Sequence, residues 1–405
     1  MYKLITYICF YFPLVSSCLN LQITVSKFVS PALAQFIAYF NLALITLGLF
    51  LFRKNIKHLS PTNQLFFIFY LLYYSFGLLA MGTSGFKTSV IATFVPVIYF
   101  IGFYFLLSNR EQFKIFFKVI SICFVISAFL TIILIKLNIN VYTGEEHGWE
   151  LDRAGGVTGD ANAAAHTSIF AFILFSQLYR PKKNIFRFLK IVILLIIFYS
   201  LYLTFSTTGL FVFTIVFFLI NYKFFTGLRL TLLAAIIPLF YIGIFALKSQ
   251  TASLGLSKAQ TDKVNNIINL LTFNFDEVDN SGRGDLVEKA LYYLYDHPIL
   301  GNGIDFSVDK LVHNTYVGVW VDSGIFTFLF FIFMLFCYFF RSFSLSPNIR
   351  FFSISILTVL YIFMISLQSV INQPYLIVLF VFVGYLIDYN KIDKGYTNIF
   401  ANKKG

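Results

Sequence analysis

Charged side chains are scarce in this sequence. Only 12% of its 405 residues are Asp, Glu, Lys or Arg, which is roughly half the share found in soluble domains. Apolar residues make up 59% of the chain, and phenylalanine alone occupies 54 positions. A water-soluble protein of this size has too little polar surface to cover so many apolar side chains. The composition therefore excludes a soluble enzyme and a disordered chain.

Cysteine and a two-residue alternation of polarity are also lacking. The four cysteines all lie inside apolar runs and form no C-x-x-C pair, so neither a disulfide framework nor a structural zinc site is expected. The strands of a transmembrane barrel would alternate between apolar and polar residues, and the long uninterrupted apolar runs of this chain exclude that fold. A polytopic helical membrane protein remains.

Long apolar runs divide the chain into segments that match the thickness of a bilayer. A membrane-spanning helix needs about 20 residues, and the sequence predicts an all-α bundle of about twelve spans with both termini in the cytoplasm. The predicted spans cover residues 4–24, 31–52, 64–81, 90–108, 114–136, 161–179, 186–205, 208–222, 231–248, 313–340, 351–368 and 372–389.

The basic residues fit this topology. Segments predicted to be cytoplasmic hold 20 of the 30 Lys and Arg residues and three of the 18 acidic residues, a balance of +17. The remaining 10 basic and 15 acidic residues give the outer side a balance of −5, and together the two sides make the net charge of +12. An excess of Lys and Arg in inner loops is the positive-inside pattern. The positive charge therefore indicates orientation in a lipid bilayer and gives no reason to expect a nucleic-acid partner.

Two outer segments are long enough to carry function. They cover residues 137–160 and 249–312, and the rest of the chain, 1–405, forms a single integral-membrane domain. The larger segment is expected to be a helical loop subdomain. Apolar spacing predicts one helix over 257–271, and a second helix is predicted to begin at Arg283 and to stop at His297-Pro298.

Three side chains at the outer ends of predicted helices could carry chemistry: Arg153, Arg283 and His313. A forked guanidinium suits phosphate or diphosphate binding, and a histidine near neutral pKa can take the proton of a sugar hydroxyl. Simpler readings stay open, because the arginines could pair with nearby acids and His313 could be a solvated interfacial residue. Asp160 and Asn162 are expected to cap the sixth span.

The context of these residues resembles the O-antigen ligase and O-antigen polymerase superfamily of bacterial membrane glycosyltransferases. That family has an Arg heading a loop helix, a Pro-and-Gly turn, and a His-Asn pair opening a span that contains Gly-Ile. An earlier Arg-Gly…Asn element is also typical. A Ser-Arg-small turn is echoed more weakly, and its Arg is missing here. The corresponding segments of this chain are 153–162, 206–209, 282–291, 296–303, 313–316 and 322–325.

The resemblance implies a GT-C-like enzyme in the bacterial inner membrane whose active site faces the periplasm. Its donor would be a glycan on undecaprenyl diphosphate. Arg153 and Arg283 would hold the diphosphate, His313 would be the general base, and Asn314 would orient His313. Direct displacement would invert the anomeric carbon. The family works without metal or cofactor, and a chain-length regulator is an implied candidate partner.

Two reactions within this superfamily, and one function outside it, remain as hypotheses. A polymerase would pass O-antigen or capsular glycan to another lipid-linked repeat unit, and a ligase would pass it to lipid A core. We favour the polymerase, although both reactions need a diphosphate clamp and a base. A polysaccharide flippase would need charged residues along a path through its spans and duplicated halves. In this sequence the candidate titratable residues cluster at the outer face, and no repeat is found.

Overall fold

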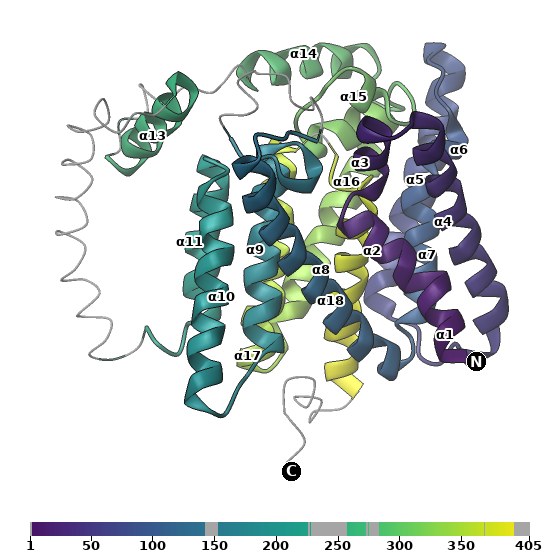
Figure 1. Cartoon of the computed structure of the whole chain (residues 1–405). Coiled ribbons are helices and arrows are strands. Elements are labelled where there is room, and N and C mark those ends of the chain that lie inside the picture. Colours follow the sequence, from purple (N-terminus) through teal and green to yellow (C-terminus); the bar gives the residue numbers. More distant parts are fainter. Residues whose placement is uncertain are drawn as a thin grey trace.

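The structure is a computed structural model that describes residues 2–141, 153–225, 227, 257–272, 274, 283–367 and 369–392. Every element within these ranges is a helix, and the long helices run side by side as one bundle (Figure 1). The all-α prediction is therefore confirmed for this part of the chain. In order the helices are α1 (Tyr2–Thr6), η1 (Tyr7–Tyr11), α2 (Phe12–Cys18), α3 (Leu21–Phe28), α4 (Pro31–Phe52), η2 (Arg53–Asn55), α5 (Pro61–Ser84), α6 (Val90–Thr93), α7 (Val95–Leu106), α8 (Arg110–Lys136), η4 (Gly156–Thr158), α9 (Ala161–Leu178), α10 (Asn184–Tyr202), α11 (Thr207–Ile220), α13 (Lys258–Leu271), α14 (Arg283–Asp296), α15 (Phe306–Asp309), α16 (Thr315–Phe343), α17 (Pro347–Ser366) and α18 (Pro374–Ile392).

Several helices begin where short polar side chains can cap them. Asp160 accepts a hydrogen bond from the backbone N–H of Ala163 at 2.7 Å, so its predicted role as the cap of α9 is confirmed. Ser60, Asn109 and Ser206 cap α5, α8 and α11 in the same way. Such caps satisfy backbone N–H groups that have no partner inside the helix.

Seven described helices are long and apolar enough to cross a membrane, or eight if one bent pair counts as a single span. They are α4, α5, α8, α10, α16, α17 and α18. Two shorter apolar helices cover Val90–Leu106 and Thr207–Ile220. The predicted span 231–248 lies outside the described residues, so the count of about twelve stays a prediction.

The bent pair is the first apolar run of the chain. The sequence predicts one span over 4–24, whereas the helices Lys3–Cys18 and Leu21–Phe28 meet at 64°. Asn20 lies between them with φ 51, in the left-handed region that asparagine tolerates better than most residues. The run therefore enters the bundle as a broken helix.

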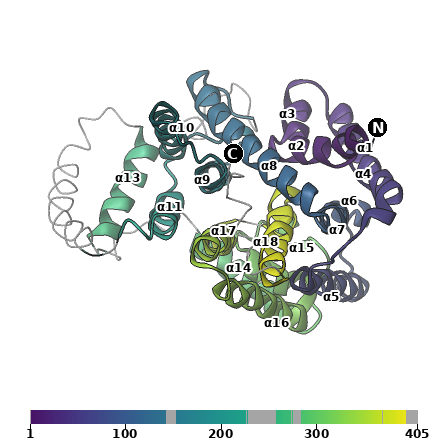
Figure 2. The same cartoon turned by 90° about the horizontal axis from the view of Figure 1, so that it is seen from below.

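Helix α18 occupies the centre of the bundle, with α5, α7, α8, α16 and α17 near it in the view along the helices (Figure 2). In its apolar stretch 83% of the residues are buried, against 17% in α10. The apolar face of α10 is thus available to lipid, whereas α18 is packed by protein on nearly all sides. Tyr385 and Tyr389 of α18 donate hydrogen bonds to the carbonyls of Tyr104 and Leu107 at 2.5 and 2.6 Å.

The two ends of the bundle differ. Helix α1 begins and α18 ends at one end, here called the inner end, whereas α14 and α15 lie at the other, here called the outer end (Figure 1). The structure thus brings both ends of the described chain to one side, as an even number of spans requires. That the inner end faces the cytoplasm remains the prediction of the charge pattern.

A buried carboxylate ties helices together at the inner end. Asp388 of α18 accepts hydrogen bonds from the backbone N–H and the hydroxyl of Thr62 at 2.9 and 2.8 Å. Arg341 of α16 donates to the same Thr62 hydroxyl at 3.0 Å. Helices α5, α16 and α18 are therefore held in register by polar contacts that lie away from bulk water.

Candidate functional site

The loop segment before α9 is attached to the connection between α10 and α11. Arg153 Nε donates to the carbonyl oxygen of Thr204 at 3.0 Å, and Ala154 N–H donates to the carbonyl of Leu203 at 2.9 Å. Carbonyls at the end of a helix have no partner within it and favour a nearby cation. Arg153 therefore lies half-buried at the C-terminal end of α10.

The Asn of the same element contacts the serine of the weaker motif. Ser206 Oγ donates to Asn162 Oδ1 at 2.8 Å and accepts from the N–H of Gly209 at 3.1 Å. Asn162 thus receives a hydrogen bond from α11, and its predicted capping of α9 falls to Asp160 alone. A side chain at Gly209 would come within 2.7 Å of Ala165 Cβ. The close approach of α9 and α11 therefore requires glycine at this position.

These contacts join two motifs whose bonded residues are 44 positions apart in the sequence. The turn 206–209 lacks the arginine of the family pattern, yet Arg153 supplies a guanidinium to Thr204, two residues before that turn. The Nε–H is one of five donors of a guanidinium. The structure therefore places the predicted diphosphate-binding Arg153 beside the Ser206 turn.

A second cluster forms where the segment after α14 meets α16. Helix α14 ends at Asp296, as the His297-Pro298 pair predicts. The N–H groups of Asn302 and Gly303 then donate to the carbonyls of Val321 and Asp322 at 2.8 and 2.9 Å. The turn thus pairs with the backbone of α16 within the first third of that helix.

Helix α16 is broken at this point. Ser323 has φ −135, and Gly324 has φ 77 and ψ 177, neither of which is helical. The N–H of Ile325 donates to the carbonyl of Pro298 at 3.2 Å. The break frees backbone groups that the turn satisfies, so the Pro-and-Gly turn and the Gly-Ile segment of the family pattern form one unit.

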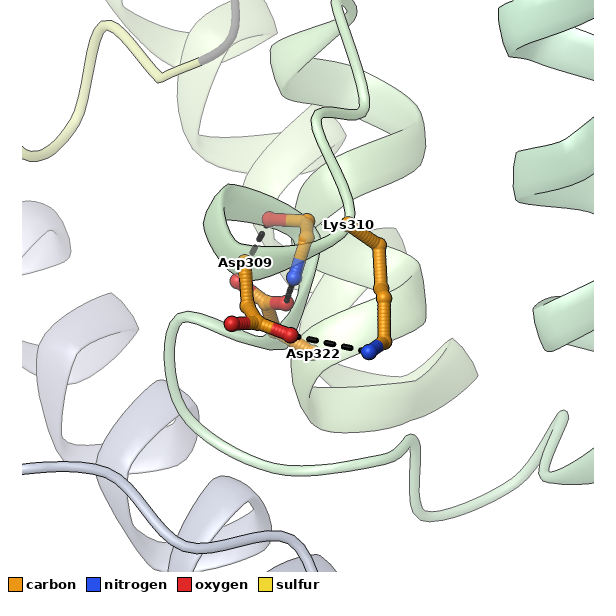
Figure 3. A network of polar contacts seen from close by, with 4 residues as sticks. Asp309, Lys310 and Asp322 are labelled. Carbon is orange, nitrogen blue, oxygen red and sulfur yellow. Dashed lines mark hydrogen bonds and ion pairs between the residues drawn. The ribbon is translucent and has the colours of Figure 1, made fainter.

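Asp322 lies at the centre of this unit (Figure 3). Its side chain is 2% exposed. It accepts hydrogen bonds from Tyr73 Oη at 2.7 Å, from the N–H of Ser307 at 2.6 Å and from Ser307 Oγ at 2.9 Å. A buried polar group needs such partners to offset its lost hydration. By contrast, the neighbouring pair Lys310–Asp309, 2.9 Å apart, is on the surface.

A second carboxylate, Asp305, lies close by. It accepts from Asn372 Nδ2 at 2.6 Å, and its N–H donates to Tyr73 Oη at 3.4 Å. Burial raises the pKa of the Asp305 carboxyl above its usual range, although the bonds from Asn372 and Tyr73 oppose the shift. Tyr73 Oη therefore links the carboxylate of Asp322 to the backbone of Asp305.

A pocket of about 270 Å³ lies beside Asp305. Besides the Asp305 carboxylate, four polar side chains line it: Thr93 at the end of α6, and Ser369, Asn372 and Gln373 from the connection before α18. Several hydrogen-bonding groups in a small concave space are the usual means of binding a polar ligand. The pocket is at the outer end because Asp305 and Asn372 bond to each other there.

The predicted base lies next to this region. His313 is exposed, and Asn314 caps α16, with its Oδ1 accepting from the N–H of Val317 at 3.1 Å. Thr315 Oγ1 donates to the carbonyl of Leu367 at 3.0 Å and accepts from the N–H of Val370 at 3.1 Å. Thr315, the residue after the His-Asn pair, is thus fixed against the connection that also supplies Asn372.

The remaining predicted residue, Arg283, is the first residue of α14, where the sequence predicts that helix to begin. Its side chain lies outside the described part of the chain, as do residues 142–152 of the shorter outer loop. Arg153, Arg283 and His313 therefore all belong to segments at the outer end. Among the described residues, no group of three His, Cys, Asp or Glu side chains is placed to hold a metal ion.

Comparison with known families bears directly on these motifs. Residues 192–332 match the family model described as O-antigen ligase. This confirms the resemblance to the O-antigen ligase and polymerase superfamily. The matched stretch contains Arg283, Asp305, His313 and the Asp322 unit, whereas Arg153 lies before it. Curated proteins gave no match.

The family match distinguishes between the hypotheses of glycan transfer and of glycan transport. Members of this family are glycosyltransferase-like enzymes that act on lipid-linked glycans, and the match supports a multi-pass membrane protein related to O-antigen synthesis. It gives no support to the flippase hypothesis, and it does not separate a polymerase from a ligase.

Sequence reasoning missed Asp305 and Asp322 as members of the site. The signal for Asp322 was an acidic residue within an apolar span, which is costly unless it has partners. Asp305 had no comparable signal, because its partner Asn372 is 67 residues away in the chain.

Proposed function

We propose that the protein is a polysaccharide polymerase that transfers undecaprenyl-diphosphate-linked O-antigen or capsular glycan to a hydroxyl of another lipid-linked repeat unit. The observation that supports glycan transfer from a lipid carrier is the match of residues 192–332 to the O-antigen ligase family. The choice of a polymerase rests on the large outer loop and the Phe- and Ile-rich composition of the sequence. In the proposed orientation the outer end faces the periplasm, and the protein is in the bacterial inner membrane.

The arginines would act on the donor. Arg153 at the Ser206 turn and Arg283 at the start of α14 would bind the two phosphate groups of the carrier. As the bond between the anomeric carbon and the diphosphate oxygen breaks, negative charge grows on that oxygen. Positive groups placed at this position stabilise the transition state more than the ground state.

The acceptor would be activated by His313. The hydroxyl oxygen of the acceptor attacks the anomeric carbon of the donor while His313 takes the hydroxyl proton. The electron pair of the broken bond leaves with the lipid diphosphate, and the attack from the opposite side inverts the anomeric carbon. No metal is needed in this scheme, because the arginines neutralise the leaving group.

The pocket beside Asp305 is our candidate for the acceptor sugar. Ser369, Asn372 and Gln373 line it, and the nearby Leu367 and Val370 bond to Thr315, two residues after His313. Carboxylate, amide and hydroxyl groups in one pocket suit the hydroxyls of a sugar ring. Asn314 would position His313 indirectly, since its side chain fixes the start of α16.

A ligase is the second candidate, because the matched family carries that description. The test uses purified protein, lipid-diphosphate-linked repeat units, and lipid A core added to half of the reactions. A ladder of products without core supports the polymerase. Transfer that occurs only when core is present would assign the ligase instead.

Site variants separate the roles in the same assay. Arg283→Ala is expected to abolish product, and Lys289→Ala on the same helix is its matched control because Lys289 is exposed. Arg153→Lys keeps the charge but loses the fork, so product should fall while the protein still inserts.

A polymerase whose product length is controlled by a chain-length regulator should also give shorter or broader ladders alone than with that partner.

A further inference from the structure

A groove lies at the inner end of the bundle, on the side of α9, α10 and α11. It consists of two pockets of about 430 and about 570 Å³ that share Gln177, Arg180, Ile220 and Asn221 along their walls. This inner groove is at the opposite end of the bundle from the pocket beside Asp305, because Arg180 follows the C-terminal end of α9 whereas Asp160 caps its outer end.

Three cations line the inner groove: Arg180, Lys190 and Lys223. None of the described residues that line it is acidic. Lys190 Nζ donates to the carbonyl of Ser176 at 2.6 Å, which holds the ammonium group at the end of α9. Arg180 and Lys190 line the same pocket, where their like charges repel each other. An anion between them would relieve that repulsion.

The wall of the groove is aromatic and apolar. Phe172 and Phe213 are 4.9 Å apart between ring centroids, and Phe198 and Phe213 are 5.0 Å apart. Phe198 is 38% exposed and Phe217 is 39% exposed. Because α10 is one of the least covered spans, this wall opens toward the bilayer. The groove thus combines a cationic mouth with an apolar surface.

We propose that the inner groove binds an anionic glycerophospholipid of the cytoplasmic leaflet. The headgroup phosphate would bind between Arg180 and Lys190, with Lys223 at the edge, and an acyl chain would lie along Phe172, Phe198 and Phe213. Basic pockets between spanning helices on the cytoplasmic side are suited to anionic headgroups. The proposal does not depend on glycan transfer, because a donor used at the outer end presents its diphosphate there.

Native mass spectrometry of the full chain in detergent tests this site. The probes are phosphatidylglycerol and phosphatidylcholine with identical acyl chains, so that only the headgroup charge differs. We expect the wild-type protein to retain phosphatidylglycerol in preference. The double substitution Arg180→Gln and Lys190→Gln should reduce that preference about 30-fold, because each of the two basic residues contributes a factor of about 5 to 6 near an anionic headgroup.

The matched control is Lys182→Gln with Lys183→Gln. These lysines are exposed in the same connection, do not line the groove, and carry the same total charge. The control should keep the lipid preference. Lys223→Gln, a single exposed change, should give an intermediate loss even if the double variant folds poorly.

Three outcomes would overturn the proposal. They are equal retention of both lipids by the wild-type protein, equal loss in the control and in the groove variant, and displacement of phosphatidylglycerol by undecaprenyl phosphate at lower concentration. The last result would assign the groove to the carrier lipid. A failed glycan-transfer assay would leave all of these measurements unaffected.

Discussion

Three hydrogen-bond donors converge on the carboxylate of Asp322, from Tyr73 and from the backbone and side chain of Ser307. In Asp322→Asn one of the two accepting oxygens is replaced by an NH₂ group, which cannot accept hydrogen bonds from these donors. We expect a loss of about 1–3 kcal/mol in stability, which is the usual cost of leaving buried polar groups unsatisfied. The melting temperature of the purified protein in detergent measures it.

Asp309→Asn is the matched control for that change. Asp309 is 52% exposed and pairs with Lys310 at the surface, and exposed ion pairs contribute little to stability. Its melting temperature should therefore remain near that of the wild type. Equal destabilisation by the two substitutions would contradict the structural role given to Asp322.

The raised pKa of Asp305 predicts a dependence of stability on pH. Burial raises this pKa in the folded state, so between the usual carboxyl pKa and the raised value the folded state holds more protons than the unfolded state. Stability therefore falls as pH rises through that interval. Asp305→Asn cannot ionise, so its melting temperature should fall less than that of the wild type from about pH 4 upward. Parallel curves for the two proteins would contradict this account.

The resemblance singled out Arg153, Arg283, His313 and Asn314, but not the groups that hold their segments in place. Asp322 depends on Tyr73, which is 249 residues away. No local pattern reports such a pairing, because it arises only when α5 and α16 pack together. The sequence could identify candidate chemistry at this end but not the polar network that supports it.

At the scale of the elements, the break in α16 depends on Gly324. Its φ of 77 and ψ of 177 are accessible almost only to glycine, and an added Cβ would be 1.9 Å from the carbonyl oxygen of Ile299. Backbone strain of this kind alone costs about 1–3 kcal/mol. Because the added Cβ also clashes with the turn 297–303, Gly324→Ala should lower the free energy of unfolding by more than that amount.

Gly82→Ala provides the comparison. Gly82 is in α5, and an added Cβ there meets no atom within 4 Å. Alanine is favoured over glycine in a helix by about 0.8–1.0 kcal/mol, so this variant should be as stable as the wild type or more stable. Limited proteolysis and the melting temperature report both effects. If the Gly324→Ala and Gly82→Ala proteins had the same melting temperature, that result would argue against the break in α16 at Gly324.

The helices of the large outer loop were largely predictable, because local signals mark their ends. Apolar spacing predicted 257–271, and α13 covers Lys258–Leu271. The segment 280–282 predicted a helix that begins at Arg283, and His297-Pro298 predicted its end; α14 covers Arg283–Asp296. The bend at Asn20 and the break at Ser323-Gly324 were not predicted, because glycine and polar residues also occur within continuous membrane helices.

At the scale of the whole molecule, the charge asymmetry predicts orientation. Lys182 is in the connection between α9 and α10 at the inner end, and Asp309 is in α15 at the outer end. In intact cells a membrane-impermeant maleimide should label Asp309→Cys but not Lys182→Cys, measured above the wild-type background of Cys9, Cys18, Cys123 and Cys337. The reverse pattern would invert the topology and move the proposed site to the cytoplasm.

The central claim is that the outer end catalyses glycan transfer with His313 as the base. The most direct measurement is product laddering by purified His313→Ala on lipid-diphosphate-linked repeat units, compared with His297→Ala from the same loop. General-base catalysis is worth about 10²–10⁴ in rate. We predict a loss of that size in His313→Ala and wild-type laddering in His297→Ala. Normal laddering by folded His313→Ala protein would contradict the account.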